Sequence, residues 1–189
     1  IGRDPEKDLQ CVRAVKDAVG DLPVEVDANE AYSGDTALRY LRQMEALVVN
    51  IEQPLPRWDL LGAAQLARAL DTPIVADQCI RTAHDVALVA NLRAADVVCL
   101  KLGTMGGITL VRKALAVAEA HGLPCTMGSA HPFGIRAAAL HHFAAAHAHV
   151  RVPLGYGSPL EDLADDLVTH PIEVNNGTIA LRDGPGLGV

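Results

Sequence analysis

The sequence predicts an α/β fold: a TIM-type barrel derived from the (β/α)8 arrangement and truncated at its N-terminal side. Half of the 189 residues are apolar but only 3% are aromatic, which suits helices packed on a parallel sheet better than a β-sandwich. Strand and helix signals alternate along the chain, as parallel strands joined by crossovers require. Three predicted strands end on an acid at equal intervals of 25 residues, about the length of one βα unit in an eight-unit barrel.

Five segments are predicted to be buried strands, because each combines β-branched and other apolar residues over a short run. They are residues 24–27, 47–52, 73–77, 96–101 and 124–128, and a weaker sixth candidate is 149–154. The first three end on Asp27, Glu52 and Asp77, and the fourth ends on Lys101. The strand ends therefore carry the polar residues of greatest interest.

Amphipathic helices are predicted between these strands, at about 35–45, 59–70, 82–93, 107–121 and 134–146. Asp35, Asp59 and Thr82 are the expected N-caps of three of them. Gly122 is the expected stop after the fourth helix, because glycine tolerates the left-handed conformation that often ends a helix.

One further helix precedes the first strand, with Asp4 as its expected N-cap and Pro5 in its first turn. Because this helix has no strand before it, we expect residues 1–189 to be a single, partial barrel domain cut from a longer polypeptide, with one or two strands missing at the front. A doubly wound open sheet is the alternative, although no G-x-G-x-x-G follows the first strand.

Charge, hydropathy and cysteine usage exclude several classes of protein. The net charge of −7 and the lack of any Lys/Arg run argue against a nucleic-acid-binding surface. No apolar stretch reaches the roughly 18 residues of a membrane span. The four cysteines have no C-x-x-C pairing, so we expect free thiols in a reducing compartment. The prediction is a cytoplasmic protein that binds neither nucleic acid nor membrane.

Parallel strands of a barrel end on one rim, where the active sites of such folds lie. Asp27, Glu52 and Asp77 are therefore expected to be neighbours in space. Adjacent carboxylates repel one another, and a divalent cation that prefers oxygen ligands, such as Mg²⁺, removes that repulsion. These three residues are the predicted metal ligands, and Asn29 is expected to orient Asp27. For any single strand-end acid, a helix cap or a surface ion pair is the alternative.

Lys101 ends the fourth strand beside the predicted metal, and we expect it to act as a general base. Partial burial and a nearby cation both favour the neutral amine. Two alternatives remain: a rim lysine that pairs with an acid, and a Schiff-base nucleophile in a barrel without a metal. The segment "GTMGG" at 103–107 is interpreted as a tight turn into the next helix.

An ordered set of segments resembles the C-terminal barrel domain of the enolase superfamily. The segments are "VDAN", "IEQPL", "ADQ", "KLGTMGG", "AEAHGLPCTMGS" and "DGPGLGV". The most similar group is that of muconate lactonizing enzymes, dipeptide epimerases and N-succinylamino acid racemases, within the muconate lactonizing enzyme/mandelate racemase family. By this resemblance Asp27, Glu52 and Asp77 hold Mg²⁺, with Mn²⁺ as an alternative ion, and Lys101 is an acid/base residue.

The resemblance also implies a reaction: Mg²⁺-dependent abstraction of a proton α to a carboxylate, which gives a metal-stabilised enediolate. The implied enzyme is an isomerase (a racemase, epimerase or cycloisomerase) whose substrate is a small carboxylic or amino acid. A dehydratase of the same superfamily and a non-catalytic, truncated metal-binding barrel are the alternatives.

The chain departs from the family's pattern in three places. The family has a Lys-x-Lys pair and a capping domain before the turn at Gly2–Asp8, so residues 1–189 alone are expected to be inactive. Separately, the full-length protein is expected to be a homo-oligomer. Gln78 stands where relatives carry Glu. His131 falls close to an acid that relatives carry near the end of the seventh strand. We expect His131 to contact the substrate or donate a proton, and a loop-capping histidine is the alternative.

Overall fold

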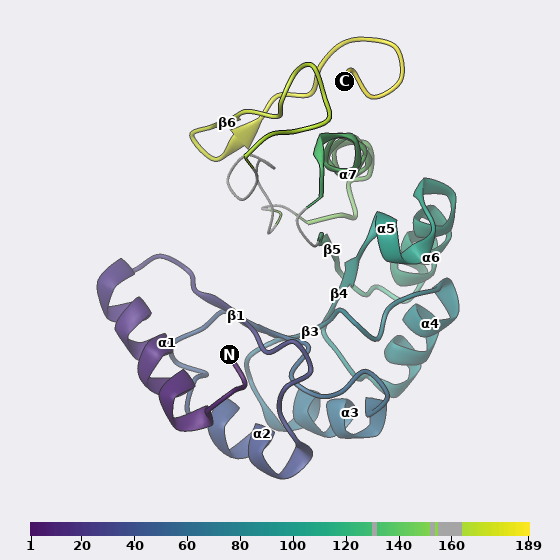
Figure 1. Ribbon diagram of the computed structural model, residues 1–189. Coiled ribbons are helices and arrows are strands. Elements are labelled where there is room, and N and C mark those ends of the chain that lie inside the picture. Colours follow the sequence, from purple (N-terminus) through teal and green to yellow (C-terminus); the bar gives the residue numbers. More distant parts are fainter. Residues whose placement is uncertain (130–131, 152–153, 155–163) are drawn as a thin grey trace.

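The computed structural model describes residues 1–129, 132–151, 154 and 164–189. Five parallel strands lie side by side in chain order, β1-β2-β3-β4-β5. Figure 1 shows them along the inside of an arc, with helices α1, α2, α3, α4 and α6 along its outside. This is an open part of a (β/α)8 barrel, so the predicted fold class is confirmed. A doubly wound sheet would carry helices on both faces, and that alternative is wrong.

All five main strand predictions are confirmed, although the strands are shorter than predicted. They are β1 Glu25–Asp27, β2 Asn50–Glu52, β3 Ile74–Ala76, β4 Val97–Leu100 and β5 Cys125–Met127. In the parallel register, Val26 lies opposite Ile51 and Asp27 lies opposite Glu52. Because neighbouring strands are only about 4.8 Å apart, this register brings the strand-end residues to one rim.

The helices are α1 Pro5–Val19, α2 Gly34–Leu41, α3 Leu60–Ala69, α4 Ala83–Leu92, α5 Leu102–Met105, α6 Ile108–Ala120 and α7 Gly134–Ala146. Their apolar faces pack on the sheet. Ile51 and Val98 from the strands are fully buried, as are Val86 and Val89 from α4 and Val111 from α6. This shared core holds the strand ends in fixed positions.

Two of the three predicted inter-strand N-caps are confirmed. Asp59 accepts a hydrogen bond from a first-turn amide of α3 at 2.9 Å, and Thr82 forms a capping box with Asp85 at the start of α4. The prediction for Asp35 is wrong, because α2 begins one residue earlier, at Gly34. Asp35 instead lies in the first turn, where its charge interacts favourably with the helix dipole.

The ends of α1 and α6 match the sequence. Asp4 caps α1 through a hydrogen bond from Lys7 N, with Pro5 in the first turn. Gly122 follows the end of α6 with a φ of 65°, the left-handed conformation that glycine adopts at little cost.

The segment "GTMGG" differs from the predicted tight turn. Its first residues belong to α5, a single helical turn, and two glycines with positive φ then lead into α6: Gly106 at 85° and Gly107 at 97°. The glycines are needed here because an L-residue with a side chain rarely adopts such angles. Lys101 is thereby held between β4 and α5.

The weak sixth strand is only partly tested. Val150 forms a parallel bridge with Cys125 of β5, while residues 152–153 lie outside the described ranges. Sequence reasoning missed a hairpin formed by β6 Val174–Asn175 and β7 Thr178–Ile179. Its signal was the Asn-Gly pair at 176–177, which is typical of two-residue β-turns.

The structure bears on the predictions for the cysteines and for membrane-spanning helices. All four cysteines are free thiols: Cys11, Cys79, Cys99 and Cys125. Among the residues with a described position, no helix has the length and apolar character needed to cross a bilayer.

Candidate active site

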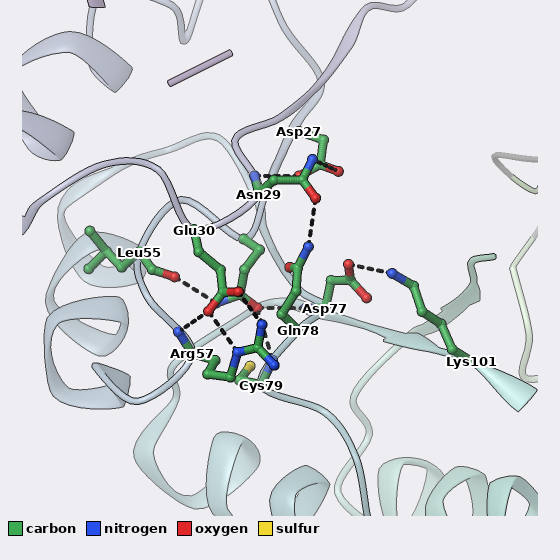
Figure 2. Close-up of polar contacts among 10 residues, drawn as sticks. Asp27, Asn29, Glu30, Leu55, Arg57, Asp77, Gln78, Cys79 and Lys101 are labelled. Atoms are coloured by element: carbon green, nitrogen blue, oxygen red, sulfur yellow. Dashed lines mark hydrogen bonds and ion pairs between the residues drawn. The ribbon is translucent and has the colours of Figure 1, made fainter. Parts of the chain in front are cut away.

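The polar strand-end residues gather on one rim of the open barrel. Asp27 and Glu52 are the last residues of β1 and β2, Asp77 follows β3 directly, and Lys101 follows β4. Figure 2 shows Asp27, Asp77 and Lys101 on this rim, with Lys101 directed at Asp77. The sequence-predicted residues are therefore neighbours, as the parallel register requires.

Glu52, Asp77 and Cys99 form a group of possible metal ligands, since one donor atom of each lies within 4.8 Å of the other two. Asp27 is outside this group but lines the same cavity, of about 540 Å³, as Glu52, Cys99 and Lys101. The predicted convergence is thus close for Glu52 and Asp77, and Asp27 stays a predicted third ligand.

Asp77 is the most constrained of these acids. Its side chain is almost fully buried, and its Oδ1 has no hydrogen-bond partner within the described part of the chain. A buried carboxylate oxygen without a partner is unfavourable unless a cation or water binds it. The donor set of carboxylate oxygens therefore fits a divalent cation such as Mg²⁺.

The electrostatics of Glu52 agree with this fit. Burial, followed by the negative charges of Asp77 and Asp27, raises the pKa of Glu52 from its ordinary value of 4.5 to about 8. Without a cation, the group avoids repulsion by keeping a proton on Glu52. A bound cation would take the place of that proton.

This raised pKa predicts a pH-dependent stability for the metal-free protein. Between pH 4.5 and about 8 the folded state keeps a proton on Glu52 that the unfolded state loses, so the free energy of unfolding falls as pH rises through this window. We expect a loss on the order of a few kcal/mol. Thermal melts in EDTA should show it, and Glu52→Gln should remove most of the slope and raise the melting temperature above pH 8.

The exposed Glu119 on α6 supplies the control. Glu119→Gln should leave the slope unchanged, and saturating Mg²⁺ should flatten the slope of the wild-type protein. Equal pH slopes for the wild-type and Glu52→Gln proteins in EDTA would contradict the assignment.

Lys101 is paired with an acid in this structure. Its Nζ donates to Asp77 Oδ2 at 2.5 Å. Burial alone lowers the Lys101 pKa, but the hydrogen bond and charge of Asp77 outweigh burial, and the pKa is raised. In the metal-free arrangement the adjacent Asp77 carboxylate thus favours the ammonium form, and the neutral amine expected beside a bound cation stays a prediction. The rim-lysine alternative describes this contact.

A chain of amide side chains orients Asp27. Asn29 donates to both Asp27 oxygens, from its backbone N at 2.8 Å and from Nδ2 at 2.6 Å. Gln78 Nε2 in turn donates to Asn29 Oδ1 at 2.8 Å, as Figure 2 shows. The expected contact between Asn29 and Asp27 is confirmed. Gln78, which departs from the family's Glu, thus holds Asn29 in place.

Sequence reasoning missed Gln53, which holds the Asp77 segment. Gln53 is 4% exposed; its Oε1 accepts from Asp77 N at 2.9 Å and from Cys79 N at 3.3 Å, and its Nε2 donates to Leu55 O at 2.9 Å. A glutamine between a strand-end acid and a proline, in an otherwise apolar segment, was the available signal. A buried amide needs such partners to offset its desolvation.

Replacing Gln53 should loosen the metal site. Gln53→Ala leaves the backbone amides of Asp77 and Cys79 without this acceptor, so we expect a loss of about 1–3 kcal/mol in unfolding free energy. Mg²⁺ affinity, measured by calorimetry, should fall roughly 10- to 100-fold because Asp77 is no longer oriented. Gln65→Ala, at an exposed position of α3, is the control and should change neither quantity. An unchanged Mg²⁺ affinity in a folded Gln53→Ala protein would rule out this role.

An ion pair joins the loops that follow β1 and β2. Arg57 Nε and Nη2 donate to the two oxygens of Glu30 at 2.9 and 2.5 Å, and Arg57 N adds a third bond at 2.7 Å. These bonds lower the pKa of Glu30, chiefly through the side-chain hydrogen bond. The pair, visible in Figure 2, fixes one part of the rim. The predicted candidate His131 lies outside the described residues.

Comparison with known proteins places these residues in a family context. Residues 1–189 match the family described as "Enolase C-terminal domain-like". Muconate cycloisomerase 1 from Rhodococcus opacus is 36% identical over 188 residues, which cover 98% of this chain and 50% of that protein. o-Succinylbenzoate synthase from Thermobifida fusca (strain YX) is 36% identical over 183 residues, covering 96% and 56%.

A solved structure shows the same fold. The dipeptide epimerase from Cytophaga hutchinsonii, complexed with Mg and the dipeptide D-Ala-L-Val, superposes with a TM-score of 0.93 at 26% identity, covering 100% of this chain and 51% of that one. The chain spans about half the length of the curated relatives that it matches.

Proposed function

Since this chain belongs to the Enolase C-terminal domain-like family, we propose that it supplies the metal site and one base for removing a proton α to a carboxylate. The proposed overall reaction is an isomerisation of a small carboxylic or amino acid, by racemisation, epimerisation or cycloisomerisation. The observation that carries the proposal is the close group of Glu52 and Asp77 beside Lys101, in which the buried Asp77 Oδ1 has no hydrogen-bond partner in the described part of the chain.

Asp27, Glu52 and Asp77 are the proposed ligands of Mg²⁺, with Mn²⁺ as an alternative. Two observations support this set: burial and the charges of Asp77 and Asp27 raise the pKa of Glu52, and Asp77 Oδ1 has no hydrogen-bond partner within the described ranges. When bound, the cation would stabilise the second negative charge that develops on the substrate carboxylate as the α-proton leaves.

Lys101 is the proposed base. Its Nζ lies beside Asp77, and Lys101 lines the cavity that Asp27 and Glu52 also line, so it is placed to act on a substrate bound there. The ion pair with Asp77 favours the ammonium form. The charge of Asp77 must therefore be neutralised before Lys101 can accept a proton. His131 is proposed to contact the substrate or to donate a proton.

Proton exchange in D₂O tests this function. The complete protein should catalyse Mg²⁺-dependent exchange of the α-proton in at least one member of a panel of dipeptides, N-succinylamino acids and muconate-type lactones, followed by ¹H NMR. Asp77→Asn serves as the catalytically dead control. If the protein binds Mg²⁺ and neither exchanges nor isomerises any member of the panel, the proposed function is wrong.

A further inference from the structure

Cys99 places a thiol beside the carboxylates of the candidate active site. It precedes Lys101 by two residues at the end of β4, and both residues line the same cavity, as the two-residue period of a strand predicts. One donor atom each of Cys99, Glu52 and Asp77 lies within 4.8 Å of the other two. A sulfur donor therefore lies within reach of the same ion position as the two carboxylates.

The sulfur is packed closely on its β5 side, since a Cβ at Gly128, just after β5, would lie only 2.6 Å from Cys99 Sγ. An ion would therefore approach Cys99 from the side of Glu52 and Asp77. Cys99 is 3% exposed, and it lines the cavity together with Glu52. Asp77 Oδ1 is buried and has no hydrogen-bond partner within the described ranges. It can therefore accept a cation while Oδ2 keeps its bond to Lys101.

We propose that Cys99, Glu52 and Asp77 form a site for a thiophilic divalent cation, such as Zn²⁺ or Cd²⁺, and that this ion excludes Mg²⁺ from the active site. Zinc binds thiolate sulfur at about 2.3 Å and carboxylate oxygen at about 2.0–2.2 Å, with water in an open fourth position. Donor atoms within 4.8 Å of one another are spaced closely enough to share one such ion. The Cys99 thiol releases its proton to solvent as the metal–sulfur bond forms.

Competition follows from the shared ligands. Mg²⁺ prefers oxygen ligands and gains nothing from sulfur, whereas thiolate selects softer ions. Both ions need Glu52 and Asp77, so only one can bind at a time. The inference shares these two residues with the proposed function but does not require the proposed reaction.

Co²⁺ is a suitable probe, because a thiolate–Co²⁺ bond gives a near-ultraviolet charge-transfer band that oxygen ligands do not give. The complete protein, reduced and metal-free, should show this band on titration with Co²⁺, and excess Mg²⁺ should reduce it. Cys99→Ser should lose the band and bind Zn²⁺ roughly 100-fold more weakly.

Cys125→Ser is the matched control, since Cys125 is the other fully buried cysteine, lies on the adjacent strand β5, and donates to Leu123 O. It should keep both the band and the Zn²⁺ affinity. Asp27→Asn should weaken Mg²⁺ more than Zn²⁺, because Asp27 lies outside the sulfur-containing group.

Retention of the band in Cys99→Ser, or its absence from the folded wild-type protein, overturns the proposal. If Cys99→Ser does not fold, cadmium NMR of the wild-type protein decides: a chemical shift in the range of sulfur-ligated cadmium supports the site, and an oxygen-only shift overturns it. A wild-type protein with the band but without α-proton exchange would retract the proposed function alone. Exchange with Mg²⁺ in a protein that lacks the band would retract this inference alone.

Discussion

Asp77→Asn should abolish Mg²⁺ binding and leave the fold intact. The side chain is almost fully buried, and its Oδ1 has no hydrogen-bond partner among the described residues. Asparagine has nearly the same shape, and its amide oxygen can still accept a hydrogen bond from Lys101, so the packing survives. The substitution removes a negative ligand that the cation needs and also removes the repulsion on Glu52.

The effect is measured as the Mg²⁺-dependent shift in thermal stability. At a Mg²⁺ concentration 100 times the dissociation constant, the wild-type protein should gain about 2.7 kcal/mol, or roughly 5–10 °C in melting temperature. The Asp77→Asn protein should show no rise in melting temperature when Mg²⁺ is added. Asp35→Asn, which makes the same charge change at an exposed position of α2, should behave as wild type. A full Mg²⁺ shift in Asp77→Asn would remove Asp77 from the ligand set.

In the complete protein, Lys101→Ala should cost roughly 10² to 10⁴ in turnover, the usual range for loss of a general acid–base residue. Mg²⁺ affinity should stay at the wild-type level or rise, because the Lys101 ammonium competes with the cation for Asp77. A fall in turnover without a fall in metal affinity distinguishes proton transfer from metal retention.

Stereochemistry makes the Lys101 test sharper. A single base reaches one face of the α-carbon, so in D₂O the exchange should fail for the enantiomer whose α-proton faces Lys101. Exchange of the other enantiomer depends on a base on the opposite face. Lys113→Ala, at an exposed position of α6, is the control and should exchange at the wild-type rate. If both enantiomers still exchange at that rate in Lys101→Ala, Lys101 is a structural lysine.

Much of the fold and of the rim followed from local patterns. Short apolar runs identified β1 to β5, and Asp59 and Thr82 marked helix starts, because capping is a contact within a few residues. Asp35 shows the limit of such reasoning: it precedes an apolar periodic segment, yet α2 starts one residue earlier. Ser33, Gly34 and Asp35 are all residue types that occur at helix N-caps. The sequence alone does not show which of them the helix starts after, because that depends on the path of the preceding loop.

The hydrogen bonds between side chains of the site could not be predicted from local sequence patterns. Gln53 accepts hydrogen bonds from backbone amides that lie 24 and 26 residues further along the chain, beyond the next strand. Gln78 donates to Asn29, which is 49 residues away in the sequence. The partners in such contacts are set by strand order and register. The protonated state of Lys101 likewise depends on its distance from Asp77 and on burial, which no spacing reveals.

By itself, the sequence determined that Asp27, Glu52, Asp77 and Lys101 share one rim. Parallel strands joined by crossovers of regular length end on one rim, and the regular interval of 25 residues between the strand-end acids indicates such crossovers. Only the tertiary structure decided which donor atoms meet: Glu52 and Asp77 with Cys99, while Asp27 lies outside this group and accepts hydrogen bonds from Asn29. The reason is that a metal site is defined over a few ångströms, and at that scale register, rotamer and burial determine distance and charge together.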